Sequence, residues 1–336
     1  MSTDVLGLDP DTYRNHPLHG RERIWTETNC ATDLWIEGLH ALGHDPVAGL
    51  AFTLGTDFDG EQWRMFTYPP EDLRELYGIE VDELNVWRPL GEHLTDQLAL
   101  GNLVAFDVDA WWLPDTAELT YRCGHQKTTV LGVMIDPVRR RFGYMHNTGY
   151  YVLADEDFEA LFPPDPPADW LPPFTLQVRL AGLRPPRLTD ERVVARLARA
   201  HLGRRPPDNP LLRMAARVEE DLPWLAERGI DTFHRWAFGA LRQCGANAEL
   251  AAAFARHLSR TGAGQGGVAA AVGLERVAAG MKRVELSLAR ATRGRAVDVA
   301  GLFSPLAVDW EQSLDLLAEV VGPEGGPGTE PEPVGR

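Results

Sequence analysis

Two closely spaced proline clusters divide this 336-residue chain. Residues 162–167 read FPPDPP and residues 171–173 read LPP. Proline has no amide hydrogen and a fixed φ, so such a run forms neither a helix interior nor a central strand. The prolines therefore predict a boundary between a half with mixed helix and strand patterns and a half that is mostly helical. We expect a first domain at residues 1–165, a proline-rich linker or strap at 166–187, a helical domain at 188–321 and a disordered tail at 322–336.

The second half repeats apolar residues at steps of three and four, which is typical of amphipathic helices in a bundle. The clearest series is Leu274, Val277, Met281, Val284 and Leu288. The first half alternates between helical and strand patterns. We therefore expect an α+β domain followed by an all-helical one.

Charge and composition exclude several classes of function. A net charge of -16 argues against a nucleic-acid partner, because phosphate binding needs a concentrated basic surface. No apolar run reaches the roughly 18 to 20 residues that cross a bilayer, and the first 20 residues lack the apolar core of an export signal. The three scattered cysteines suggest no disulfide framework, and the histidines show no HExxH or paired-cysteine spacing for zinc. We expect a cytoplasmic protein with no membrane, metal or nucleic-acid partner.

The segment from Glu27 to Gly43 predicts a helix that begins at a cysteine. Asn29 is a favoured N-cap residue, since its side-chain oxygen can accept from an amide of the first turn. The apolar residues that follow at helical spacing are Leu34, Trp35, Leu39 and Leu42. A helix start favours an anion, and the thiolate is the nucleophilic form of cysteine. Cys30 is therefore a candidate nucleophile; the alternative is a small buried apolar residue.

Three β-rich segments follow. Residues 102–109 predict a buried strand that ends in acids, and residues 125–136 predict a longer central strand. Residues 141–147 would return as its antiparallel neighbour. His125 opens one strand of this hairpin and Asn147 closes the other, so antiparallel pairing would place them close together.

These residues match the requirements of nucleophilic cysteine chemistry. A thiol on a helix needs an imidazole on a separate element, and the imidazole needs a third group that fixes its tautomer. We expect Cys30 as nucleophile, His125 as base and Asn147 as the orienting group. The amide of Cys30 could stabilise an oxyanion. Further candidates for the oxyanion and orienting roles are Asn29, His146 and Asp109.

Several sequence blocks resemble known families. The blocks ETNCATDLWIEGLHALG, AFTLGTDFDGEQW, LYGIEVDELNVWRPL, HQKTT and YMHNTGYY look like domain-of-unknown-function family 1839; the resemblance is strong over about residues 20–162 and loose over the helical half. The block VDAWWLP, followed by His125 at the start of a strand, resembles the N-terminal domain of the butirosin biosynthesis protein H family. Members of that family are papain-fold cysteine acyltransferases. The resemblance implies Cys30 as nucleophile and His125 as base, whereas Asn147 departs from the usual aspartate.

The resemblance also implies a function. It suggests a papain-like fold and the transfer of an acyl or aminoacyl group from a carrier-protein thioester to a small amine. The phosphopantetheine of the partner carrier protein would be the acyl donor, with no cofactor bound to this chain. The alternatives are a papain-like hydrolase, either a peptidase or a thioesterase, and a catalytically silent protein that binds a carrier or a ligand.

Other residues are candidates for binding. An arginine-rich stretch could dock an acidic carrier protein, or it could be a solvated helix face. Aromatic residues could line an acyl pocket or cap a cleft, although they are more often core. The candidate docking residues are Arg192, Arg196 and Arg199. The candidate substrate-binding residues are Glu27, Trp63, Trp112, Lys127, Phe233 and Trp236.

Overall fold

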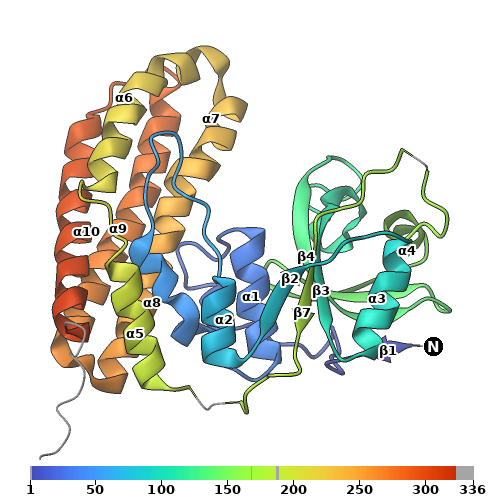
Figure 1. Cartoon of the computed structure of the whole chain (residues 1–336). Helices are drawn as coiled ribbons and strands as arrows, with labels where there is room; N and C mark the ends of the chain where they lie inside the picture. The colour runs from blue at the N-terminus through green and yellow to red at the C-terminus, as the bar shows by residue number, and fades with distance from the viewer. Residues whose placement is uncertain (1, 168, 187–188, 323–336) are drawn as a thin grey trace, which may run out of the picture. The chain divides into compact units, whose positions relative to one another are not determined.

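The computed structural model describes residues 2–167, 169–186 and 189–322, and the chain divides into two compact units (Figure 1). The first unit comprises Met1–Leu50 and Met65–Asp190, and the second comprises Ala51–Arg64 and Glu191–Arg336. The predicted disordered tail lies, apart from its first residue, outside the described residues. No helix within the described ranges combines the length and the apolar character needed to cross a lipid bilayer.

One boundary differs from the sequence-based prediction. Residues 51–64 were expected in the first domain, but they pack with the helices of the second unit. The ring of Trp63 lies edge-on to Trp310 at 5.4 Å, and Asp57 pairs with Arg213. A large buried aromatic contact of this kind stabilises the segment against the helices. Sequence proximity alone could not indicate that contact.

Within the described residues, the first unit contains a seven-stranded sheet in which each pair of neighbouring strands is antiparallel. The order is β2-β7-β3-β4-β5-β6, and β1 also pairs with β4. The strands are β1 (Thr3–Asp4), β2 (Glu80–Glu83), β3 (Leu103–Asp109), β4 (Lys127–Asp136), β5 (Arg141–His146), β6 (Gly149–Ala154) and β7 (Thr175–Arg179). The predicted strands at residues 102–109, 125–136 and 141–147 are confirmed as β3, β4 and β5, with ends that differ by one or two residues.

The segment predicted as a linker contains a strand. β7 lies between β2 and β3 in the sheet, within residues 166–187. β7 contains no proline, so every residue of the strand keeps its amide for the ladder. Thr175 and Val178 are buried. The proline cluster is therefore a connection into the sheet as well as a boundary.

Helices cover both faces of this sheet. The helices of the first unit are α1 (Cys30–Ala41), α2 (Pro70–Tyr77), α3 (Leu90–Ala99) and α4 (Asp155–Leu161). Short 3-10 helices are η1 (Pro17–His19), η2 (Pro46–Gly55), η3 (Ala110–Trp112) and η4 (Pro114–Thr116). Gly38 of α1 lies so close to Leu131 that an added Cβ would be 2.9 Å from its side chain. Phe162, which follows α4, packs against Phe106 on the opposite face.

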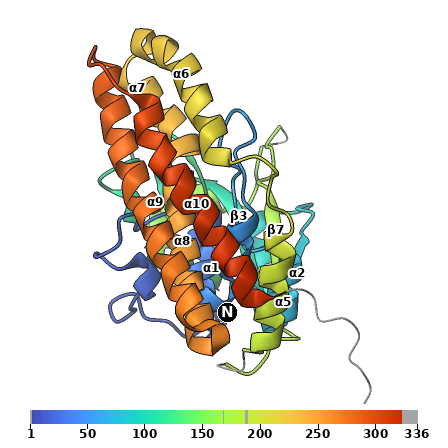
Figure 2. The same cartoon turned by 90° about the vertical axis from the view of Figure 1, so that its left-hand side faces the viewer.

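The second unit is helical, as expected. Its helices are α5 (Glu191–Leu202), α6 (Pro210–Arg228), α7 (Ile230–Ala237), α8 (Gln243–Leu258), α9 (Gly264–Ala291) and α10 (Val299–Val321), with π-helical segments η5 (Phe238–Arg242) and η6 (Ser259–Ala263). Figure 2 shows α8, α9 and α10 alongside one another. The predicted apolar series from Leu274 to Leu288 is buried, which confirms it as a bundle seam.

Helices α9 and α10 approach closely because of glycines at steps of seven residues. A Cβ at Gly273 would overlap with Ser313, and a Cβ at Gly280 would overlap with Leu306. The missing side chains let the two antiparallel helices pack backbone to side chain. Close packing of α9 against α10 at these glycines therefore contributes to the stability of this unit.

Candidate functional site

The first turn of α1 places Cys30 at the start of the helix. Asn29 has extended backbone, and its Oδ1 accepts from the amide of Thr32 at 3.0 Å. Its Nδ2 donates to the carbonyl of Phe66 at 3.1 Å, and Thr32 donates to the same carbonyl at 2.7 Å. The predicted N-cap is confirmed. These bonds fix the direction in which the first turn points.

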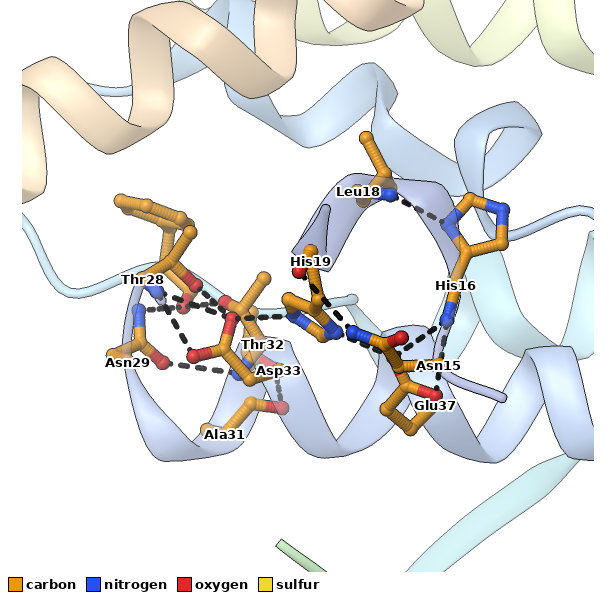
Figure 3. A network of polar contacts seen from close by, with 12 residues as sticks. Asn15, His16, Leu18, His19, Thr28, Asn29, Ala31, Thr32, Asp33 and Glu37 are labelled. Carbon is orange, nitrogen blue, oxygen red and sulfur yellow. Dashed lines mark hydrogen bonds and ion pairs between the residues drawn. The ribbon is translucent and has the colours of Figure 1, made fainter. Parts of the chain in front are cut away.

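A buried ionic network supports the same turn (Figure 3). His19 lies between two acids of α1, with Nδ1 2.5 Å from Glu37 and Nε2 3.3 Å from Asp33. Asp33 also accepts from the amide and the hydroxyl of Thr28, at 2.9 and 2.6 Å. Burial alone would lower the pKa of His19, but the hydrogen bonds and charges of Asp33 and Glu37 outweigh it and raise the pKa to about 9. His19 is therefore an imidazolium between two carboxylates.

The sequence analysis did not single out this network. The available signal was Asp33 and Glu37, four residues apart on the predicted helix that also carries the apolar repeat from Leu34 to Leu42. Acids on a buried helix need a cationic or hydrogen-bonding partner. The pattern does not identify His19 as that partner, because His19 lies in a separate segment.

The side chain of Cys30 faces a row of polar groups on β3 and β4. Cys30 is half-buried, and its Sγ–H donates to Oγ1 of Thr129 at 3.6 Å. Thr129 in turn donates to Oδ1 of Asp107 at 2.6 Å, and Nζ of Lys127 donates to the same oxygen at 3.2 Å. Thr129 is paired with Asp107 in the β3–β4 register, so both side chains lie on one face. Among the described residues, the backbone amides of Cys30 and Ala31 have no hydrogen-bond acceptor.

His125 lies beyond the other end of this row. Its Nδ1 is 2.6 Å from Oδ2 of Asp109, and its ring stacks on Trp111 at 4.6 Å. Burial would raise the pKa of Asp109, but hydrogen bonds from His125 and from two backbone amides hold it below its usual value. The side chain of His125 is 73% exposed, and Nε2 has no partner in the described part of the chain. A cavity of about 400 Å³ is lined by Asp107, Asp109, His125 and Lys127.

The structure does not bring His125 to Cys30. No hydrogen bond joins the two residues in the described ranges. Cys30 contacts Thr129, which is four residues after His125, and four residues of extended chain span about 13 Å. The expected contact between thiol and imidazole is therefore absent from this conformation, because the imidazole precedes the strand that the thiol contacts.

Asn147 does not orient His125. It lies in the turn between β5 and β6, with φ of 45°. The β4–β5 register pairs Leu131 with Met145, and its continuation puts Asn147 opposite Thr129 rather than His125. The prediction for Asn147 is thus wrong in this structure, and the group that bonds to the imidazole is Asp109, one of the alternatives.

His146 has a different set of partners. Its Nδ1 is 2.5 Å from Asp115, and its Nε2 is 2.8 Å from the hydroxyl of Thr128. The side chain is almost completely buried. Because both ring nitrogens are occupied, His146 cannot orient His125, and that alternative is also wrong here. The Asp115 bond instead anchors the segment between η3 and β4 to the sheet.

The remaining first-unit candidates lie around the row. Trp112 lies under the guanidinium of Arg122, with 4.6 Å between the guanidinium carbon and the ring centroid. Lys127 lines the cavity described above and binds Asp107. Glu27 is half-buried in the segment before α1. These three residues stay candidates for substrate binding.

The aromatic candidates of the second unit do not line an open pocket. Trp63 and Phe233 are completely buried in the helical core, so neither can contact a ligand there without repacking. Trp236 is half-buried and donates from Nε1 to Asp221 at 3.0 Å. The predictions that Trp63 lines an acyl pocket and that Phe233 caps a cleft are therefore wrong here, because both rings belong to the core of the helical unit.

The arginines of α5 differ among themselves. Arg192 and Arg196 are exposed, whereas Arg199 donates to the carbonyl of Val321 at the end of α10, at 2.7 Å. Arg199, Arg204 and Arg205 line a groove of about 600 Å³. Docking of an acidic partner here stays a prediction.

A metal site finds no support in the described residues, which contain no group of three or more His, Cys, Asp and Glu side chains able to hold an ion.

Comparison with known proteins identifies the family. The DUF1839 N-terminal domain matches residues 14–180, and the DUF1839 C-terminal domain matches residues 188–319. No curated protein matches the chain. The chain belongs to the DUF1839 family, and the boundary between its two domains falls after the proline clusters.

Proposed function

We propose that this DUF1839 protein is a cysteine-dependent acyltransferase in which Cys30 carries the acyl group. The observation that supports it best is the thiol at the first residue of α1, beside two unbonded amides and facing the polar row on β3 and β4. A helix start stabilises negative charge on sulfur and on a developing oxyanion. We propose that the fold is papain-like, because a cysteine on a helix lies against an antiparallel sheet that carries a histidine and a carboxylate.

In the proposed first step, Sγ of Cys30 attacks the carbonyl carbon of a thioester. A new thioester forms on Cys30, and the donor leaves as its free thiol. The amides of Cys30 and Ala31 would hold the oxyanion of the tetrahedral intermediate. The proposed donor is the phosphopantetheine thioester of a carrier protein, which would dock on the arginines of α5.

In the proposed second step, a small amine attacks the acyl carbon on Cys30; the amide bond forms, the C–S bond breaks, and Cys30 leaves as its thiol, which takes up the proton that the amine loses. His125 has its Nδ1 occupied by Asp109, which leaves Nε2 to take a proton from the amine. The acceptor would occupy the cavity that His125 and Lys127 line. This step requires the imidazole to approach Cys30 once the acyl group is bound.

Two other functions have a specific observation in their favour. The exposed ring of His125 favours a thioesterase or peptidase, because water reaches Nε2 freely. The missing hydrogen bond between Cys30 and His125 favours a silent binding protein. All three candidates predict different fates for an acyl group at Cys30.

Intact mass after incubation with acetyl-pantetheine separates the three. A transferase gains an acetyl adduct that an added amine removes with formation of the amide. A hydrolase gains an adduct that decays equally fast without amine. A binding protein gains none. Cys30→Ala should abolish the adduct, and Cys123→Ser should retain it, since Cys123 is an exposed thiol elsewhere in the same unit.

A further inference from the structure

We infer that Thr129 and Asp107 act as positioning residues that hold Cys30 as a neutral thiol in the resting protein. The inference deepens the proposed function, because it concerns the same nucleophile. It assigns the thiol hydrogen to a chain of hydrogen bonds rather than to His125. Acylation then requires this chain to open.

The direction of the hydrogen bonds follows from what each group can donate. The carboxylate of Asp107 only accepts, so the hydroxyl of Thr129 donates its single hydrogen to Oδ1. The oxygen of Thr129 has only lone pairs left for Cys30. The contact at 3.6 Å is therefore Sγ–H donating to oxygen, and it needs the hydrogen on sulfur.

A thiolate at the same place would meet the wrong partners. It has no hydrogen to donate, so it would face the lone pairs of Thr129, with the negative charge of Asp107 behind them. A like charge and a lost hydrogen bond both disfavour the ionised form. Oδ1 of Asp107 already accepts from Thr129 and Lys127, so the hydroxyl of Thr129 stays directed at Asp107 and away from the sulfur.

Two features near Cys30 favour the thiolate instead: the start of α1 and the ammonium of Lys127. The start of α1 favours an anion at Cys30. The bond that a thiolate would lose comes from a weak Sγ–H donor, and the repulsion from the Asp107 carboxylate behind Thr129 adds to that loss. Lys127 is the nearest cation, but its ammonium is already bound to Asp107.

The other charged groups near this turn have separate partners. Asp33, in the same turn of α1, binds Thr28 and His19. Glu27 precedes the helix. Asp109 and His125 form a pair at the far end of the row. The balance between the thiol and the thiolate form of Cys30 therefore depends mainly on Thr129, Asp107 and Lys127.

The test is the rate of iodoacetamide alkylation of Cys30 as a function of pH, measured by peptide mass spectrometry. Asp107→Asn and Thr129→Val should each speed alkylation at about pH 6 to 7 by roughly tenfold, because either change removes part of the chain that holds the thiol hydrogen. Thr129→Ser keeps the hydroxyl and should match the wild type. Asp82→Asn is the control, since Asp82 lies on β2 of the same sheet and pairs with Arg179, and this variant should leave the rate unchanged.

The opposite sign would overturn the inference. If Asp107→Asn slows alkylation, then Asp107 assists ionisation; if the rate is unchanged, the chain has no influence on the thiol. Should Asp107→Asn fail to fold, the difference between Thr129→Val and Thr129→Ser decides alone. The acetyl adduct is measured separately, so a faster alkylation without any adduct refutes the acyltransferase while the inference about the thiol stands.

Discussion

Two cysteines lie near the start of a helix, yet their surroundings are opposite. Cys30 is the first residue of α1, is half-buried and has a polar partner in Thr129. Cys244 is the second residue of α8 and is completely buried. Burial raises the pKa of the Cys244 thiol well above its ordinary value. One thiol is placed for chemistry and the other is part of a core.

The difference comes from how the chain enters each helix. Asn29 is extended, with φ of -147°, so the amides of the first turn of α1 have no preceding turn to bond to. Arg242, before α8, is helical with φ of -65°, because η5 runs directly into α8. The start of α8 is therefore the middle of a continuous helix. A helix start favours an anion only where the chain changes direction.

The largest expected effect is on the alkylation of these two thiols. In the native protein, iodoacetamide should modify Cys30 at least about a thousandfold faster than Cys244, because a fully buried thiol reacts only after an opening that costs several kcal/mol. Timed quenching and peptide mass spectrometry give both rates in one sample. In denaturant the two rates should converge. Comparable rates in the native protein would remove the contrast between the two helix starts.

The sequence predicts the environment of Cys30 only in part. Asn29 and the apolar repeat suffice to predict the start of α1, because capping is a local property. The pairing of His125 is not local. β4 has neighbours on both sides, and the hairpin suggested only β5, whereas Asp109 comes from β3.

The register of the strands is a second feature that the sequence does not predict. The pairing of β4 with β5 shifts between Gly132 and Met134, where a bulge interrupts the ladder. The alternation of apolar and polar residues in the sequence does not reveal a shift of this kind. The residue pairs at the end of the hairpin away from the turn also depend on where the turn begins. The position of Asn147 opposite Thr129 could therefore not be predicted from the sequence.

A second test concerns the support beneath each cysteine, which is ionic under Cys30 and apolar around Cys244. Asp33→Asn leaves His19 and Glu37 without part of their network, and breaking a buried ion pair costs roughly 3–5 kcal/mol. Urea unfolding measures the loss of unfolding free energy. His40→Gln, on the same helix and half-buried, should cost less than about 1 kcal/mol. Equal costs for the two variants would show that the network contributes no special stability.

The ionic support should also depend on pH. The pKa of His19 is raised from 6.5 to about 9, so the folded state binds this proton more tightly than the unfolded state. The stabilisation is complete below about pH 6.5 and is lost as pH rises through about 9, and it amounts to something on the order of 3 kcal/mol. Unfolding free energy should fall over that interval in the wild type. In the His19→Gln variant, this fall in unfolding free energy should disappear. A fall of the same size in the variant would show that another group causes it.

The smallest expected effect tests the apolar side of the comparison, where packing rather than charge maintains the helices. Gly280 of α9 has no room for a side chain beside Leu306 of α10. Gly280→Val should therefore lower unfolding free energy by about 1–3 kcal/mol, the usual cost of overpacking, and the movable end of Leu306 favours the lower part of that range. Ala269→Val, which adds two carbons where Gly280→Val adds three, lies at an exposed position of α9 and serves as control. The loss at Gly280 should be independent of pH between about 6.5 and 9, unlike the loss expected from the His19 network. If Gly280→Val is as stable as the control, the two helices have room to separate, and close glycine packing does not stabilise this unit.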